Sequence, residues 1–551
     1  MPRGEGVPRG YPDSSEWVGS DMKGGWRWAA ALVVTGAVWA GCKQQTGGHD
    51  ESERNNPGLD SPREDGPGTP PPVDPGTGGG GSPGTGTQTP DAGTKTPDAG
   101  TPPGPGTPPG PGTPPGPVTP TPPAPEEAIQ FTSPPGWQFY GTQHGGPRRV
   151  YGITADEGGN VWVAGGEDGL FLLRPGADTL QRFTMADGLR PYGFMPDGSE
   201  PPGEKYLKVI SVAGGPAGTV FVGYEGRPGT GSNHCESNWD GPSPDPSRYK
   251  SGDADKVTLR TDGTLEVVHY DIFSGPGVVR DELRGREKIC NILRIAYDKN
   301  TNSVWFGGNH GFSRGDARYT GNNTCNGQLS CSGVMEHVHP HINALNEQGN
   351  VVLLTDAYYG VAVHPSGDAF FGGSNRSTRF RYGSNGNNYW RAQSMSEDHA
   401  YAWNRFDLWP DKVGEPNMSR PADRVDDHVS GIAVAGEDTV WVSSFTRGLA
   451  RMNAEGGDIQ YLNVGVPHLS TVAVDPTDGS VWTGARWLGS VFRVKDGSVH
   501  TYGCADFGRR LCMSTVADIQ VDRSNGRRIL VGFKGSDENR VPGAIGIYSG
   551  N

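Results

Sequence analysis

The sequence predicts an all-β protein, a seven-bladed β-propeller closed by an N-terminal outer strand. Three observations predict it: a strand-turn-strand unit recurs, most units continue into further strands, and the strand missing from the last unit stands ahead of the first. The unit is clearest at 429–442, Val-Ser-Gly-Ile-Ala-Val-Ala-Gly-Glu-Asp-Thr-Val-Trp-Val. β-Branched and aromatic residues fill both strands around an acidic turn, which is typical of a β-hairpin.

Seven copies of this hairpin follow one another after residue 128. One large apolar residue marks the second strand of each copy: Trp162, Phe221, Trp305, Phe370, Trp441, Trp482 and Leu530. Third and fourth strands follow in most copies, as at 170–174 with 180–184. In the third copy, 334–339 fits either the third or the fourth strand. Four-stranded units repeated without helical stretches indicate a propeller.

The two extremities of the repeat region complement each other. The last unit ends at 544–548, Ala-Ile-Gly-Ile-Tyr, which is its third strand. An outer-type strand, 137–141, Trp-Gln-Phe-Tyr-Gly, precedes the first unit. We expect these two strands to pair, with Phe139 close to Ile547, because pairing removes the sheet edge that a ring would otherwise expose.

We assign the propeller to 129–551. The composition of the chain changes twice before it. Residues 1–21 are polar and do not resemble an export signal, so we expect translation to start at Met22. A short basic segment and an apolar run follow, the order of a signal peptide over 22–41. Residues 42–128 are rich in Pro, Gly and Thr and have nothing to bury, which predicts a disordered tether.

The end of the apolar run, Ala40-Gly41-Cys42, resembles the lipobox of bacterial lipoproteins. In that family the Cys becomes the acylated first residue of the mature chain, so the resemblance implies a lipid anchor on Cys42. Trp39 stands where an aliphatic residue is usual, and an ordinary signal cut after Ala40 is the alternative. Because Lys43 rather than Asp follows the Cys, we expect an outer-membrane lipoprotein or a cell-surface or secreted protein of the bacterial envelope.

Cysteine parity supports an exported protein. Without Cys42, six of the seven cysteines remain, an even number that indicates disulfides in an oxidising compartment. Proximity pairs Cys325 with Cys331 and Cys504 with Cys512, and leaves Cys235 with Cys290. Fifteen pairings are formally possible. A zinc site is the rival interpretation, but the sequence has no Cys-x-x-Cys spacing.

The repeated Val-Trp-Val core, followed by Gly and by Gly-Leu, resembles the two-component regulator propeller repeats and, more distantly, the streptogramin lyases. The resemblance covers about 137–551. It implies a seven-bladed propeller and does not specify an activity.

The long connections should gather on one face of the propeller. Turns between first and second strands, such as 156–159 and 435–438, are short. We assign the insertions to connections on the opposite face: 184–206, 225–254, 272–290, 395–427 and 503–513. Long loops on one face indicate a recognition surface. We therefore predict a monomeric binding or scaffold module for a protein or glycan partner, attached to the membrane through its lipid alone.

Each inner strand begins on that same face, at the mouth of the central channel. Polar residues precede most of these strands, so one interpretation is a small anionic or polar ligand on the axis, and the other is simple solvation of the rim. The candidate ligand-binding residues are Arg149, Tyr151, Lys208, Asn291, Tyr359, His428 and His468.

Catalysis is the alternative function. The distant resemblance to streptogramin lyases implies a lyase or lactonase in which His428 and His468 act as acid/base or metal residues. Gly311-Phe-Ser-Arg-Gly315 spells a nucleophile elbow but stands among strands and Gly-rich loops. His337 and His339 would share one face of a strand, as candidate metal ligands or as an exposed polar strand.

We expect no cofactor. The net charge of −14 argues against a nucleic-acid partner, because phosphate binding needs a basic stripe and none appears in the sequence.

Overall fold

The computed structural model describes residues 128–192, 205–226, 252–270, 289, 291–309, 311–320, 339–345, 351–353, 357–373, 377–380, 399–401, 404–406, 408, 428–524 and 526–550. Contacts divide the chain into two units, Met1–His49 and Asp50–Asn551, and every described residue belongs to the second. The expected signal peptide, most of the expected tether, Cys42 and His337 lie outside the described residues. So do Cys235, Cys290, Cys325 and Cys331.

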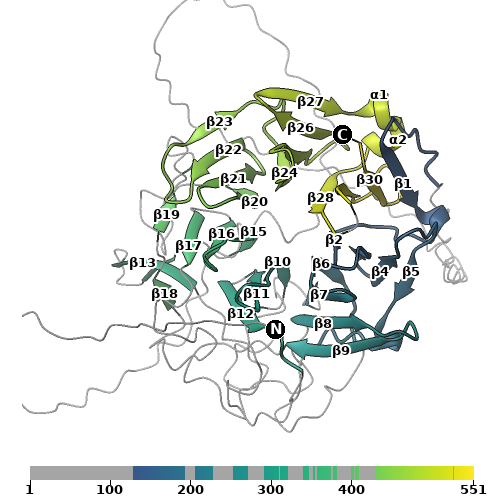
Figure 1. Cartoon of the computed structure of the whole chain (residues 1–551), viewed down its shortest axis with the longest axis horizontal. Coiled ribbons are helices and arrows are strands. Elements are labelled where there is room, and N and C mark those ends of the chain that lie inside the picture. Colours follow the sequence, from purple (N-terminus) through teal and green to yellow (C-terminus); the bar gives the residue numbers. More distant parts are fainter. Residues whose placement is uncertain are drawn as a thin grey trace, which may run out of the picture. The chain divides into compact units, whose positions relative to one another are not determined.

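Among the described residues, six four-stranded antiparallel sheets form the blades of a β-propeller (Figure 1). In five of these sheets the strands follow one another in chain order. These five are β2 (Gly152–Ala155), β3 (Val161–Ala164), β4 (Leu170–Leu173) and β5 (Gln181–Phe183); β6 (Val209–Gly214), β7 (Thr219–Tyr224), β8 (Ala254–Leu259) and β9 (Leu265–Tyr270); β15 (Tyr358–Val363), β16 (Ala369–Gly373), β17 (Ser377–Phe380) and β19 (Asn404–Phe406); β20 (Val429–Ala435), β21 (Thr439–Ser444), β22 (Gly448–Asn453) and β23 (Gln460–Leu462); and β24 (Leu469–Val474), β25 (Val481–Ala485), β26 (Val491–Lys495) and β27 (Ser498–Tyr502).

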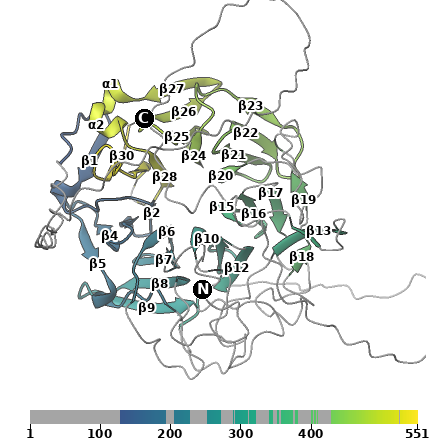
Figure 2. The ribbon, with the colours of Figure 1, turned by 180° about the vertical axis from the view of Figure 1, so that it is seen from behind.

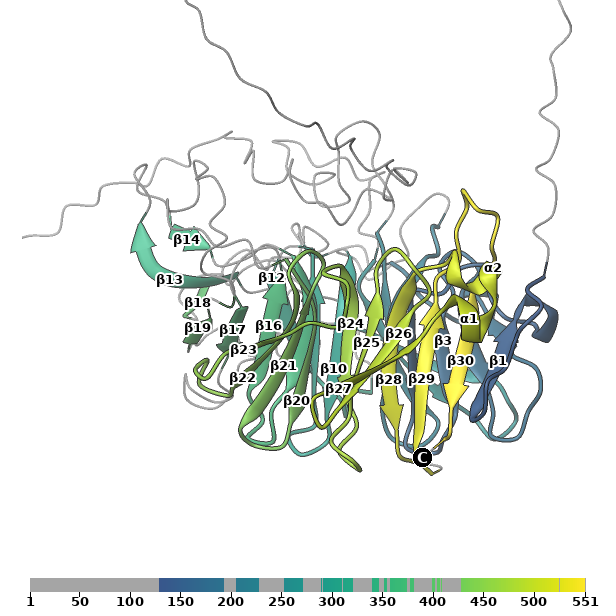
Figure 3. The same ribbon diagram turned by 90° about the horizontal axis from the view of Figure 1, so that it is seen from above.

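The sixth sheet joins the two extremities of the propeller, as predicted. Its order is β1-β30-β29-β28, so the N-terminal strand β1 (Trp137–Gly141) pairs with β30 (Ala544–Tyr548), beside β29 (Arg528–Phe533) and β28 (Val516–Asp522). Gln138 lies opposite Ile547, and Phe139 lies opposite Gly546. Figure 3 shows β1 beside β30. The pairing confirms the expected closure.

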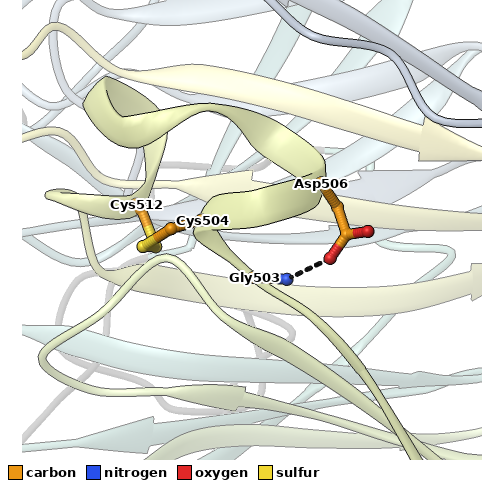
Figure 4. Close-up of a disulfide and its surroundings, with 4 residues drawn as sticks. All are labelled: Gly503, Cys504, Asp506 and Cys512. Atoms are coloured by element: carbon orange, nitrogen blue, oxygen red, sulfur yellow. Dashed lines mark hydrogen bonds between the residues drawn. A yellow bond between two sulfur atoms is a disulfide. The ribbon is translucent and has the colours of Figure 1, made fainter.

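An aromatic cluster reinforces this closure. The Trp137 ring lies 5.2 Å from the ring of Tyr548 and 4.9 Å from that of Phe507. Phe507 belongs to α1 (Cys504–Phe507), which the Cys504–Cys512 disulfide ties to α2 (Arg509–Cys512) (Figure 4). This disulfide confirms one of the three predicted pairs.

The blade count differs from the prediction of seven four-stranded units. The third unit shows three strands in the described ranges, β10 (Ile292–Asp298), β11 (Ser303–Gly308) and β12 (Gly311–Asp316). Its third strand is β12 rather than 334–339, because β12 follows β11 directly and forms a hairpin with it. Residues 321–338 lie outside the described ranges. A separate sheet contains β13 (His339–Leu345), β14 (Val351–Leu353) and β18 (His399–Tyr401).

The innermost strands contact one another in a cycle. From β2 the contacts run through β6, β10, β15, β20, β24 and β28, and β28 contacts β2 (Figure 2). The recurring glycine of the second strand permits this approach. A Cβ atom at Gly484 would lie 2.3 Å from Val516, and one at Gly372 would lie 2.7 Å from Val429. The glycine therefore leaves room for the innermost strand of the next sheet.

The large residue that marks each second strand is buried between neighbouring sheets. Trp162, Trp305 and Trp482 have no exposed side-chain surface, and Phe221, Phe370 and Leu530 share this burial. Trp441 differs, being half-buried against a cluster that includes Leu469 and Val472. Burying such side chains at every interface provides the hydrophobic driving force that holds the sheets together.

The connections distribute over two faces. We call the face with the turns between first and second strands the hairpin face, and the face where the innermost strands begin the loop face. The insertions within 184–206, 225–254, 272–290 and 503–513 join strands on the loop face, as predicted. The assignment of 395–427 to one loop-face connection was wrong in part, because strand β19 lies within it. The residues between β17 and β19, 381–403, join a third strand to a fourth and so belong to the hairpin face. Three residues are too few for a strand pattern to be recognised.

No helix among the described residues is long and apolar enough to cross a membrane.

Candidate functional site

A cavity of about 240 Å³ lies at the loop-face end of the channel, where the innermost strands begin. Its lining residues come from the starts of these strands and from the residues that follow β21, β25 and β29. We call it the axial cavity. It draws on sheets far apart in the sequence, so its chemistry depends on the cyclic arrangement of the propeller.

A repeated β-bulge builds the wall of the axial cavity. The register shifts between Val209 and Ser211 in β6, and an equivalent shift occurs near the start of β10, β15, β20, β24 and β28. The residue inside each shift lines the cavity: Ile210, Leu293, Tyr359, Ser430, Ser470 and Ala517. A bulge leaves one residue out of the ladder and redirects its side chain. The bulges therefore determine which side chains face the axis.

Aromatic side chains form much of the wall. Tyr151, Tyr359, Phe445 and Trp487 line the cavity, and the rings of Tyr359 and Phe445 meet edge-on at 5.2 Å. Burial raises the pKa of Tyr359, although Arg486 opposes this shift. Burial also raises the pKa of Tyr151, with Lys208 opposing it. Both phenols are therefore neutral at physiological pH and offer apolar faces with one hydroxyl each.

An ion pair crosses the cavity. The Arg294 guanidinium on β10 lies 2.8 Å from the Asp518 carboxylate on β28. Arg294 also donates to the Tyr359 carbonyl at 3.2 Å, while Asp518 accepts from the Ile153 amide and the Thr471 hydroxyl, each at 3.3 Å. Asp518 is 1% exposed, so these donors replace water around its charge. The pair is electrically neutral, and with these hydrogen bonds it ties five sheets together.

Two further cations line the cavity, Arg486 and Lys534. The Arg486 guanidinium lies 4.6 Å from the ring centres of both Phe445 and Trp487, and the Lys534 ammonium lies 5.3 Å from that of Tyr151. Burial lowers the pKa of Arg486, which Tyr359 partly offsets. Because the opposite charges of Arg294 and Asp518 cancel each other, Arg486 and Lys534 give the cavity lining a net positive charge.

Four of the predicted binding residues lie at or beside the axial cavity. Tyr151 and Tyr359 line it. Lys208 lies 5.6 Å from the Tyr151 ring and pairs with Glu225 at 2.7 Å. Burial alone would lower the pKa of Lys208, but Glu225 raises it overall. His468 lies behind the wall, with Nδ1 3.0 Å from the Phe445 carbonyl oxygen.

The other three do not line the cavity. Arg149 pairs with the Asp537 carboxylate and donates to the Val541 carbonyl at 3.3 Å. Asn291 is buried and accepts a hydrogen bond from the Gly226 amide at 2.7 Å. The backbone of His428 is left-handed, with φ of 47°, and its carbonyl accepts from the Phe445 amide at 2.8 Å. These residues shape the rim through the backbone and through neighbouring side chains.

Phe445, Arg486 and Lys534 line the cavity but were not predicted from the sequence, although a signal for them existed. Their amides donate to the carbonyls of His428, His468 and Thr515 at 2.8, 3.0 and 2.8 Å. Phe445 and Arg486 are therefore the hairpin partners of His428 and His468, two of the predicted binding residues, and Lys534 has the equivalent position opposite Thr515. The signal for these three residues is their position directly after a second strand.

The nucleophile-elbow pattern has no catalytic geometry. Ser313 has no exposed surface and lies within β12, which continues through Arg314 to Asp316. His339 lies in β13, where only the backbone is described. Within the described ranges, no group of three or more His, Cys, Asp or Glu side chains is placed to hold a metal ion.

A second cavity, of about 790 Å³, opens at the hairpin-face end of the channel. Asp156, Asp298 and Asp522 line it, each directly after or at the end of a first strand. Asp156 accepts from the Gly158 amide at 2.7 Å and from the Trp162 indole at 2.9 Å. Asp298 and Asp522 accept from the amide two residues on, at 2.9 and 2.8 Å. Such bonds stabilise turns, so these carboxylates serve the fold.

No protein-family model and no curated protein matches the sequence. Among solved structures, the chain is similar to the extracellular domain of a hybrid two-component system from B. thetaiotaomicron, with 13% identity and a TM-score of 0.41. That match covers 75% of this chain and 41% of the other, so the chain spans less than half the length of that protein.

Two further solved structures show a comparable likeness. A chain of the mitotic checkpoint complex has 11% identity and a TM-score of 0.42, covering 78% of this chain and 96% of that one. The WD40 β-propeller domain of Doa1 has 12% identity and a TM-score of 0.39, covering 77% and 97%. These similarities concern the fold.

Proposed function

We propose that this protein is a binding module, a scaffold for a protein or glycan partner that it recognises through the loop face. The observation that carries the proposal is the axial cavity, which combines four aromatic side chains with two cations at the centre of that face. Binding sites are typically concave and mostly apolar, with a few polar groups that fix orientation. The cavity has this composition.

The edge of the cavity extends the binding surface outward. Trp487 is 51% exposed and its neighbour Leu488 is 49% exposed, so both present apolar area to solvent. Tryptophan and arginine contribute disproportionately to interface energies, because they combine a large contact area with directed polar groups. Trp487 stacked on Arg486 provides both at one place.

The lyase or lactonase alternative receives less support. It would use His428 and His468 as acid/base or metal residues, and neither lines the axial cavity. The Nδ1 atom of His468 already contacts the Phe445 carbonyl. Binding therefore remains the function that this geometry supports best.

We further propose that the propeller has seven blades, with the β10-β11-β12 sheet as the third. The contacts of β10 with both β6 and β15 support this assignment, because they place the three-stranded sheet between two complete ones. Seven blades would agree with the resemblance to the two-component regulator propeller repeats.

For the cellular address, we propose export by a signal peptide at 22–41, a lipid anchor on Cys42 and a tether over 42–128. The outer membrane or the cell surface is the proposed location. The Cys504–Cys512 disulfide supports export, since disulfides persist in oxidising compartments. The remaining two proposed pairs are Cys235 with Cys290 and Cys325 with Cys331.

Site-specific crosslinking in cells that produce the protein tests the binding function. A photoreactive residue replaces Trp487 on the loop face and, in a control chain, Glu437 in a turn of the hairpin face. We expect adducts from position 487 and few from position 437, and mass spectrometry then identifies them as peptide or sugar. Absence of adducts at 487, or equal adducts from both positions, would contradict the proposal.

A further inference from the structure

Building on the proposed binding function, we propose that the axial cavity selects a carboxylate carried on a six-membered ring, and that Arg486 binds this carboxylate. Phe445, Trp487 and Tyr151 would contact the flat faces of the ring. The assignment rests on how the cations at this end of the channel are partnered, on the hydroxyl groups of the wall and on the size of the cavity.

The partners of the cations single out Arg486. Arg294 lies 2.8 Å from Asp518, Lys208 lies 2.7 Å from Glu225, and Arg149 pairs with Asp537. Among the described residues, by contrast, no carboxylate or other hydrogen-bond acceptor contacts the Arg486 side chain, which touches only aromatic rings. Burying a cation without an anionic partner is unfavourable. A ligand carboxylate would offset that cost.

The side chain of Arg486 is well prepared for a planar anion. Two aromatic rings, each centred 4.6 Å from the guanidinium, restrict it, so little conformational freedom would be lost on binding. Arginine binds carboxylates through two parallel N–H···O bonds, which give direction as well as strength. Lys534 adds positive charge to the same lining. The negative charge of Asp518 is engaged by Arg294, so it repels an incoming anion less.

The remaining wall favours a ring over a hydrophilic ligand. Ser430 donates to the Ser443 hydroxyl at 2.9 Å, and Ser470 and Ser211 donate to backbone carbonyls. Their hydrogens are therefore used within the protein. What remains toward the cavity is mainly aromatic surface, which binds the flat faces of rings.

The volume limits the ligand to about one ring. A cavity of about 240 Å³ is smaller than the roughly 300–1,000 Å³ of sites for drug-sized ligands. It corresponds to about eight water molecules, at roughly 30 Å³ each. A single ring with its carboxylate fits this space, and a larger partner would continue past Trp487 onto the loop face.

The test measures the binding of matched pairs to the full chain by calorimetry. Benzoate is compared with benzamide, and D-glucuronate with D-glucose, so that the pairs distinguish an aromatic acid from a sugar acid. We expect at least tenfold tighter binding of the carboxylate in one pair. Inorganic phosphate is the control anion, and we expect it to bind at least tenfold more weakly than that carboxylate.

Variants assign the preference to its residue. Arg486→Gln should abolish the preference while leaving the melting temperature within a few degrees, and Arg174→Gln, an exposed arginine elsewhere, should leave it intact. Should the glutamine variant fail to fold, Arg486→Lys takes its place. Lysine retains the positive charge but cannot donate two parallel hydrogen bonds to a carboxylate, so most of the carboxylate preference should be lost.

Four outcomes would each overturn the inference. They are equal binding within both pairs, no binding of any probe, phosphate binding as tight as the carboxylate, and a carboxylate preference that persists in Arg486→Gln. The proposed function has a separate outcome. If position 487 crosslinks a partner while no pair shows a carboxylate preference, the binding function stands and the carboxylate assignment fails.

Discussion

The two ends of the central channel are built from the same repeat but use their charged groups differently. At the hairpin face, Asp156, Asp298 and Asp522 accept hydrogen bonds from nearby amides. At the loop face, Asp518 pairs with an arginine from another sheet, and Arg486 faces aromatic rings. These three hairpin-face aspartates therefore all stabilise their own turns, whereas at the loop face Asp518 acts between sheets and Arg486 lines the cavity.

The difference follows from where the repeat is regular. The turns between first and second strands are short and similar, so one aspartate serves the same local purpose in several of them. At the loop face the connections vary, and the bulges redirect a different side chain in each sheet. A backbone geometry that repeats from sheet to sheet, with a different side chain in each, is well suited to recognition, because the side chains can differ without disturbing the framework.

The largest expected effect is at Asp518. Replacing it by Asn leaves Arg294 without its anionic partner in a largely buried position, and we expect a loss of about 3 kcal/mol in the free energy of unfolding. Urea denaturation measures it. A double-mutant cycle with Arg294→Gln should show strong coupling between the two sites. Additive effects would mean that the cross-channel pair does not tie the sheets together.

A smaller loss is expected at the hairpin face. Asp156→Asn keeps the shape but weakens the bonds to Gly158 and Trp162, and we expect a loss of about 1–2 kcal/mol. Asp178→Asn, at an exposed turn position, is the matched control and should change stability by less than about 0.5 kcal/mol. Ligand binding at the loop face should be unchanged by either variant. A change in binding for Asp156→Asn would break the separation between the two ends.

A pH-dependent effect is expected from His269, which lies buried in β9 between Asp253 and Asp255. Burial alone would lower the pKa of His269, but its hydrogen bonds to the two aspartates raise it overall. The folded pKa thus exceeds the unfolded value of about 6.5. The stabilisation is therefore complete below that value and is lost as pH rises through the folded pKa.

The measurement for His269 is the melting temperature as a function of pH. We expect the wild-type melting temperature to fall as pH increases above neutrality, and this slope to be weaker in His269→Gln. His500→Gln removes an exposed histidine and should leave the slope unchanged. Parallel slopes in all three proteins would show that the buried cluster does not control the response.

The smallest effect on stability is expected at Trp487, where the substitution should act on binding instead. Trp487→Ala removes a half-exposed side chain, so the free energy of unfolding should change by less than about 0.5 kcal/mol. We expect the carboxylate probe to bind about tenfold more weakly, equivalent to about 1.4 kcal/mol. The adjacent Leu488→Ala is similar in exposure but does not line the axial cavity, so it should bind this small probe normally. Equal losses for both variants would indicate a general surface effect.

The sequence predicted the architecture because its signals are local and repeated. The hairpin at 429–442 and its copies identified the strands, and the complementary ends identified the pairing of β1 with β30. β19 escaped prediction because Asn-Arg-Phe is too short to show a pattern. For the third unit, 334–338 of the predicted strand lie outside the described residues.

The candidate site was predictable in place but not in composition. Tyr151 directly precedes β2 and Tyr359 lies near the start of β15, and both were predicted, whereas Arg486 is brought to the cavity by its pairing with His468. The Arg294–Asp518 contact joins residues 224 positions apart. Such a contact depends on the register of the bulges, which alternation of apolar residues does not reveal.

The β1–β30 pairing also affects how the protein is made. Strand β1 leaves the ribosome about 400 residues before its partner, which takes on the order of 20–80 s at typical elongation rates. During that delay Trp137 and Phe139 have no sheet to join. A chaperone that shields this short aromatic segment until synthesis reaches β30 would therefore increase the yield of correctly folded protein.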